Sequence, residues 1–198
     1  MTETVPAPDT PAGTARRTGI ALLAAAFVFV ALTRIQTISA PDFWSHLASG
    51  RAIARLGGAA LRDTLSYTAH GQSLRSAGWL YDRALYALWQ LGGPALVTLT
   101  HALLFLGAAA LALRAAARWS PPGGPAAAAL ALAGWLAAFE SPVSPTAVSV
   151  FAAAAFLHEL SRHRSLVRLA ATLIIGQILW ANMDAAFLLG PVLALLGA

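Results

Sequence analysis

The chain has no cysteine and no lysine, and few charged residues of any kind. The lack of cysteine excludes disulfide bonds and thiol chemistry. Charged residues make up 11% of the 198 residues, whereas a soluble domain carries about 25%. Hydrophobic residues make up 58% of the chain, and its mean hydropathy is +0.67. This composition is typical of a multi-pass membrane protein in contact with the lipid bilayer.

All thirteen basic residues are arginines, and they stand at the ends of apolar runs or within residues 40–93. No basic cluster interleaves with aromatic residues, so the net charge of +5 does not indicate nucleic-acid binding. The arginines that flank apolar runs fall on alternate loops: Arg16 and Arg17, then Arg114 and Arg118, then Arg162, Arg164 and Arg168. The positive-inside rule then predicts a bacterial inner-membrane protein with a cytoplasmic amino terminus.

Apolar runs predict about six spanning helices, at residues 18–33, 94–113, 126–139, 146–157, 169–181 and 185–198. The expected fold class is all-α, a multi-pass transmembrane helical bundle. Residues 1–17 are rich in proline, threonine and alanine and predict a disordered cytoplasmic tail, followed by a transmembrane domain at 18–198. We expect Arg34 to snorkel to the membrane interface from the end of the first helix.

Residues 40–93 form the expected extracytoplasmic loop, with two amphipathic helices on the membrane surface. Apolar residues recur at helical spacing over 42–56, and Gly57 and Gly58 end that segment. A short extended piece is predicted at 65–68. Residues 79–91 carry two tryptophans and two tyrosines, which prefer the headgroup level, and the run from Gly92 to Pro94 ends this second helix.

The predicted topology gathers five acids on the outer face: Asp42, Asp63, Asp82, Glu140 and Asp184. Asp42 and His46 lie four residues apart and share one helix face. A carboxylate at the mouth of a membrane cavity can act as a general base or as a metal ligand, and Arg51 nearby can bind a lipid phosphate. In the alternative reading, Asp42 caps a helix while His46 and Arg51 lie among lipid headgroups.

Asn182 and Asp184 join two apolar runs, and polar groups at such depth indicate a cavity or pore. The alternative is that they turn the chain at the water interface, with Asp184 as a helix cap. Asp82 and Arg83 lie on the second amphipathic helix and are predicted to be solvated.

Four segments together resemble a known family. They read DFWSHLASGRAIARLGG, RDTLSYTAHGQ, GWLYDRALYALWQLGG and ILWANMDAAFLLGP, and the resemblance spans about residues 35–195. The first three resemble the first outer loop of large bacterial membrane proteins of the GT-C glycosyltransferase type. The fourth resembles the Trp-x-Asn-x-His-Gly stretch of those proteins.

The resemblance implies a GT-C-like fold in which helical spans carry an outer loop of interfacial helices. It implies transfer of a sugar from a polyprenyl-phosphate-linked donor, on the extracytoplasmic face, by direct displacement. The acid of the first outer loop, the implied catalytic base, matches Asp42, which we also consider as a ligand of a divalent metal. His46 and Arg51 would position the donor phosphate, and Asn182 and Asp184 would contribute polar groups from the facing turn.

The chain departs from the family pattern in several places. Ala77 and Gly78 replace an expected His-Glu, and Asp184 and Ala185 replace an expected His-Gly. Because GT-C enzymes are longer, we expect the chain to be the amino-terminal part of such an enzyme, or a truncated or degenerate relative. The competing hypothesis is a non-catalytic membrane subunit that scaffolds a partner protein through its small residues. A transporter with Asp184 in its path is a third hypothesis.

Overall fold

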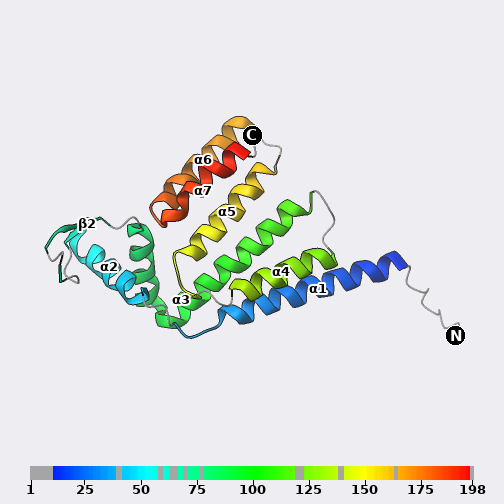
Figure 1. Cartoon of the computed structure of the whole chain (residues 1–198), viewed down its shortest axis with the longest axis horizontal. Coiled ribbons are helices and arrows are strands. Elements are labelled where there is room, and N and C mark those ends of the chain that lie inside the picture. The colour runs from blue at the N-terminus through cyan, green and yellow to red at the C-terminus, as the bar shows by residue number, and fades with distance from the viewer. Residues whose placement is uncertain are drawn as a thin grey trace, which may run out of the picture.

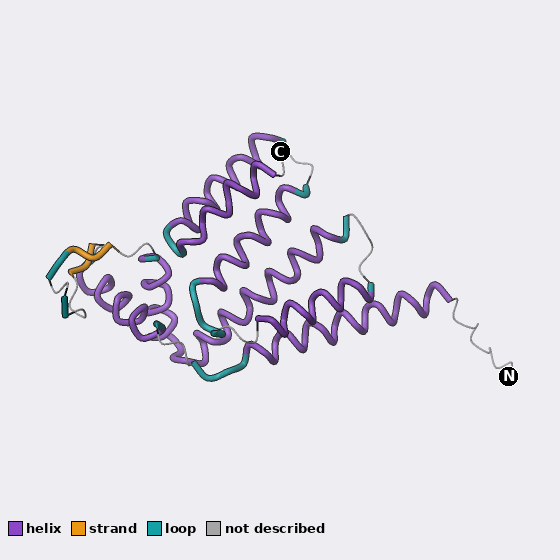
Figure 2. Tube along the Cα trace, viewed as in Figure 1, coloured by secondary structure: helices purple, strands orange, loops and turns teal. Residues whose placement is uncertain are grey.

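The computed structural model describes residues 11–38, 42–57, 60–62, 67–68, 71–75, 78–118, 123–137, 141–162 and 165–196. Within these residues the protein is all-α apart from one small hairpin (Figures 1 and 2). The helices are α1 (Pro11–Arg34), α2 (Phe43–Leu56), α3 (Trp79–Ala116), α4 (Gly124–Ala137), α5 (Thr146–Leu160), α6 (Leu166–Ala181), the 3-10 helix η1 (Ala185–Leu188) and α7 (Leu189–Leu196). The strands β1 (Ala60–Arg62) and β2 (Ser73–Arg75) pair antiparallel, with Leu61 opposite Leu74.

Two helices of the described residues are long and apolar enough to cross a membrane: Arg17–Arg34 within α1, and α3. The expectation of about six spans is therefore wrong. The remaining apolar helices have 8 to 16 residues, fewer than the ~20 that a bilayer requires. The polar turn at 182–184, for example, ends α6 after 16 residues.

The predicted disordered tail also differs from the structure, because residues 11–17 already belong to α1. Residues 1–10 lie outside the described residues.

Helix α3 is two helices joined at a sharp kink. Gly93 has φ 59° and ψ −153°, a backbone conformation that a residue with a side chain rarely adopts. Pro94 follows and removes one backbone donor. The first part, 79–91, is the predicted aromatic helix, and the second, 94–116, is the predicted apolar one. The kink turns the chain back, so that each part packs on a different neighbour (Figure 1).

Three helix pairs organise the molecule: α2 with α3, α3 with α5, and α1 with α4. Helices α6 and α7 cover the side of α5 that faces away from α3 (Figure 1). One core cluster, around Phe43, Tyr81, Leu85, Val97 and Val143, joins α2, both parts of α3 and the segment before α5. A second cluster, around Val30 and Leu130, joins α1 to α4.

Arg34 lies inside the protein rather than at an interface. Its side chain is fully buried, and its guanidinium carbon lies 4.2 Å from the centre of the Phe105 ring. The cation–π contact with an aromatic ring replaces the expected reach toward water. The prediction that Arg34 snorkels is therefore wrong.

Many large apolar side chains remain exposed on the helices. They include Leu32, Leu99, Leu103, Ile174, Ile175, Ile178, Leu195 and Leu196, each more than half exposed. A soluble surface rarely carries so many large exposed apolar side chains. These faces are suited to contact with lipid or with another apolar protein surface.

Candidate functional site

Helix α2 begins directly after Asp42 and ends at Gly57, as predicted. Asp42 occupies the N-cap position, but its side chain makes no capping hydrogen bond. The Ser45 hydroxyl instead donates to the Asp42 carbonyl oxygen at 2.7 Å. The Asp42 carboxylate is 61% exposed, so it is available to a ligand.

A close crossing of α2 and α3 places His46 against a buried acid. At Gly50 a Cβ atom would lie 2.0 Å from the Asp82 carbonyl oxygen, so only glycine permits this approach. His46 precedes Gly50 by one helical turn and lies on the same face. Its Nδ1 atom lies 2.6 Å from Asp82 Oδ1. The Asp82 side chain is 2% exposed and that of His46 is 27% exposed.

The second ring nitrogen of His46 faces the exposed acid. Nε2 lies 3.7 Å from Asp42 Oδ2, so the imidazole lies between one buried and one exposed carboxylate. The hydrogen bond to Asp82 raises the pKa of His46, and the charges of Asp82, Asp42 and Asp184 act in the same direction. Partial burial opposes them, but the net effect is a raised pKa. The pair with Asp82 therefore shifts His46 toward the imidazolium form, in which Nδ1–H donates to Asp82 and Nε2–H lies on the open side.

A second histidine, His101, forms a buried hydrogen bond with Tyr81, which contacts His46. The ring of Tyr81 lies edge-on to His46, with 5.4 Å between ring centres. His101 Nδ1 lies 2.8 Å from the Val97 carbonyl oxygen and therefore carries the proton. His101 Nε2 is then the acceptor for the Tyr81 hydroxyl, at 3.0 Å.

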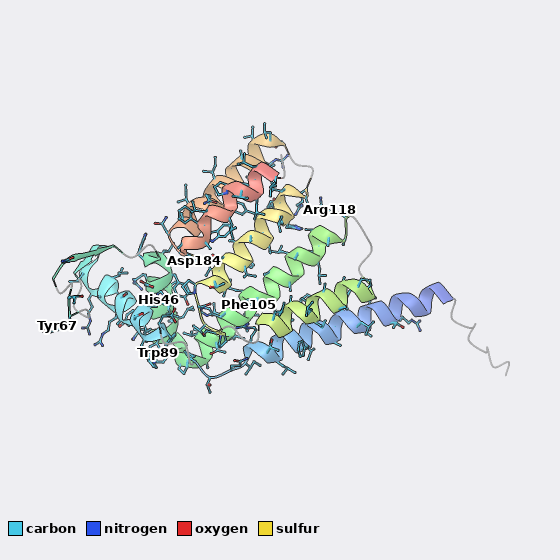
Figure 3. All side chains as sticks on the ribbon, in the orientation of Figure 1. His46, Tyr67, Trp89, Phe105, Arg118 and Asp184 are labelled. Carbon is cyan, nitrogen blue, oxygen red and sulfur yellow. The ribbon has the colours of Figure 1, made fainter. Side chains whose placement is uncertain are left out.

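Asp184 reaches the same region from the turn between α6 and η1. Its Oδ2 atom accepts a hydrogen bond from the Ser149 hydroxyl on α5, and Ser149 accepts one from Trp180 Nε1 at 2.7 Å. Asp184 is also close enough to raise the pKa of His46. Asp42, His46 and Asp184 thus lie toward one end of the helices, and Figure 3 shows His46 and Asp184 there, far from Arg118.

Asn182 joins the same turn to the start of α3. Its side-chain oxygen accepts from Trp79 Nε1 at 2.7 Å, and its side-chain nitrogen donates to the Ile178 carbonyl oxygen at 2.7 Å. Its backbone oxygen accepts from the Leu80 amide at 3.0 Å. These bonds hold Asn182 in place and thereby position Asp184, which follows two residues later.

Arg51 lies apart from the other predicted residues. It lines a groove of about 950 Å³ between α2 and the first part of α3, together with Arg55, Trp44, Tyr86 and Trp89. Neither Asp42 nor His46 lines this groove. Arg51 and His46 are five residues apart, which places them on different faces of α2.

Sequence reasoning missed Asp82, which was expected to be solvated. The signal was present, because Asp82 follows Tyr81 and precedes Leu85 by three residues, and all three are buried on one face. The predicted outer acids Asp63 and Glu140 lie outside the described residues. The extended piece predicted at 65–68 lies there in part, and Tyr67 and Thr68 form a bend between the two strands.

Within the described part of the chain, no group of three or more histidine or acidic side chains is arranged to bind a metal ion. No protein-family profile, curated protein or solved structure matches the chain.

Proposed function

We propose that the protein is a GT-C-like membrane enzyme that transfers a sugar from a polyprenyl-phosphate-linked donor at its α2 end. The observation that carries the proposal is the position of His46 between the buried Asp82 and the exposed Asp42. An exposed carboxylate beside an imidazolium supplies a base and an anion-binding donor within one site.

We assign Asp42 and His46 to the two halves of a displacement. Asp42 would accept the proton of an acceptor hydroxyl while the hydroxyl oxygen attacks the anomeric carbon of the donor. The bond from that carbon to the phosphate oxygen breaks, and polyprenyl phosphate leaves. Nε2–H of His46 would donate to the phosphate oxygen, where negative charge develops.

Asp82 and Asp184 support this chemistry without reacting. Asp82 holds the orientation of the imidazole and raises its pKa. Asp184, tied to Ser149, adds negative charge and fixes the facing turn. Arg51 has no part in this reaction, because it lines a groove that neither Asp42 nor His46 lines.

The membrane location is part of the proposal. It is supported by the two apolar helices of spanning length and by the exposed leucines and isoleucines of the shorter helices. Arg118 lies at the end of α3 away from His46 and donates to the Ser161 carbonyl oxygen. Arg118 therefore lies at one end of the α3–α5 pair and Asp184 at the other (Figure 3). The positive-inside rule would place the arginine end in the bacterial cytoplasm and the His46 end outside.

The test is sugar transfer by the protein in its native membranes, with tritiated polyprenyl-phosphate hexoses and pentoses as donors. Asp42→Asn should lower transfer by about 10²-fold or more, the usual effect of losing a general base. The matched control is Arg83→Gln, a change at an exposed residue of the neighbouring helix. Equal transfer by wild type and Asp42→Asn would contradict the role of Asp42.

A second candidate is a non-catalytic subunit. The exposed apolar residues of α6 and α7, among them Ile174, Ile178 and Leu195, are suited to a partner protein as well as to lipid. Cross-linking from this face in native membranes would distinguish the two, because an enzyme that stands alone would yield lipid adducts without a stoichiometric protein partner.

A further inference from the structure

The groove that contains Arg51 is basic and aromatic. Arg51 and Arg55 are both exposed and one turn apart on α2, so their guanidinium groups can reach one anion together. None of the side chains that line the groove is acidic. The groove therefore has the charge of a site for a phosphate or another compact anion.

The wall of this groove is made of residues that favour a membrane interface. Trp44 is 58% exposed, and its ring meets that of Trp89 edge-on, with 5.8 Å between ring centres. Tyr86 lines the same wall. Tryptophan and tyrosine prefer the headgroup level of a bilayer, where one end of the ring is apolar and the other is wet.

A second groove adjoins the first and shares Trp44 and Trp89 with it. It has a volume of about 780 Å³ and lies between the end of α1 and the apolar part of α3. Ile35, Leu99 and Leu103 line it, and each is more than half exposed. The basic groove thus adjoins, at two shared tryptophans, an apolar groove that lies along a helix of spanning length.

We propose that these two grooves together bind one anionic phospholipid. Its phosphate lies on Arg51 and Arg55, its glycerol region lies on Trp44 and Trp89, and an acyl chain follows the apolar groove along α3. The occupant is assigned from charge complementarity and from the adjacency of a basic and an apolar groove, which suits a molecule with a head and a tail. The inference rests on the proposed membrane location but not on sugar transfer.

The test is native mass spectrometry of the full chain in detergent, titrated with dioctanoyl phosphatidylglycerol, dioctanoyl phosphatidylcholine or glycerol 3-phosphate. Wild type should retain one phosphatidylglycerol in preference to the other two. The double variant Arg51→Gln/Arg55→Gln should weaken that retention by about tenfold or more, since each arginine near an anionic lipid contributes about 1 kcal/mol. Arg83→Gln, which removes an exposed arginine outside both grooves, should leave retention unchanged.

Three outcomes would overturn the assignment. Equal retention of both phospholipids, unchanged in the double variant, would mean that the arginines select no headgroup. Equal binding of glycerol 3-phosphate, together with no effect of Ala95→Trp in the apolar groove, would mean that no acyl chain is bound. Displacement of phosphatidylglycerol by an equimolar amount of polyprenyl phosphate would assign the grooves to the lipid-linked donor. Because binding is read without catalysis, its failure would leave the proposed sugar transfer to be judged by its own assay.

Discussion

His46 Nδ1 lies 2.6 Å from Asp82 Oδ1, and the two residues come from helices that cross at Gly50. The acid is almost fully buried and the histidine is about one quarter exposed. A buried carboxylate with a charge-assisted hydrogen bond is a strong constraint on the ring that it orients. Because Nδ1 is bonded to Asp82, Nε2 is the ring nitrogen of His46 that stays open to a ligand.

Asp82→Asn should bring the pKa of His46 back toward its ordinary value, because the amide carries no charge. A charge-assisted bond is worth about 1.5–3 kcal/mol and the neutral bond that an amide oxygen can still accept about 0.5–1.5 kcal/mol, so the free energy of unfolding should also fall by about 1–2 kcal/mol. The measurement is an NMR titration of the imidazole C–H signals. Asp42→Asn is the comparison and should lower the pKa less, since Asp42 is mostly exposed and lies farther from the ring. A His46 pKa that is the same in Asp82→Asn as in wild type would contradict the pairing.

The pH dependence of stability follows from the same raised pKa. A group whose pKa is higher in the folded than in the unfolded protein stabilises fully below its unfolded pKa, and this stabilisation is lost as the pH rises through the folded value. For His46 the pH range over which this stabilisation is lost begins near pH 6.5, the ordinary histidine pKa, and extends above it. The stability advantage of wild type over His46→Asn should therefore shrink from acidic to alkaline pH in detergent unfolding experiments. An advantage that grows with pH would show that the sign of the shift is wrong.

Gly50→Ala should separate α2 from α3. Alanine favours an isolated helix by about 0.5–1 kcal/mol over glycine, so a loss of stability can come only from the contact. The added Cβ would lie 2.0 Å from the Asp82 carbonyl oxygen, and overpacking of this kind costs about 1–3 kcal/mol. The readouts are thermal unfolding and the His46 pKa, which should fall as the ring moves away from Asp82. Ala48→Ser, at an exposed position of the same helix, should change neither. A more stable Gly50→Ala protein would refute the close crossing.

The periodicity of the sequence predicted α2 well, because its apolar spacing and Gly57 are local signals. The approach of Asp42 to His46 was equally local, since residues four apart on a helix are neighbours. The burial of Asp82 was not predicted, because aromatic residues around it suggested a membrane interface. In the structure Tyr81 and Leu85 are core residues, and Asp82 shares their face.

The number of spanning helices was predicted poorly for a different reason. Hydropathy identifies apolar runs, but helix length depends on where caps and turns fall, and α4 to α7 end before 18 residues. The position of Arg34 over Phe105 and the separation of Arg51 from His46 depend on how distant helices pack. Such contacts have no signature within a single helix.

The most direct test of the central claim is the pH profile of sugar transfer in native membranes, measured for wild type and Asp82→Asn with tritiated polyprenyl-phosphate sugars. If His46 acts as an imidazolium held by Asp82, transfer by wild type should fall as the pH rises through the raised pKa of His46. In Asp82→Asn this alkaline fall should move to lower pH. An alkaline fall at the same pH in both proteins, or none in wild type, would contradict the account.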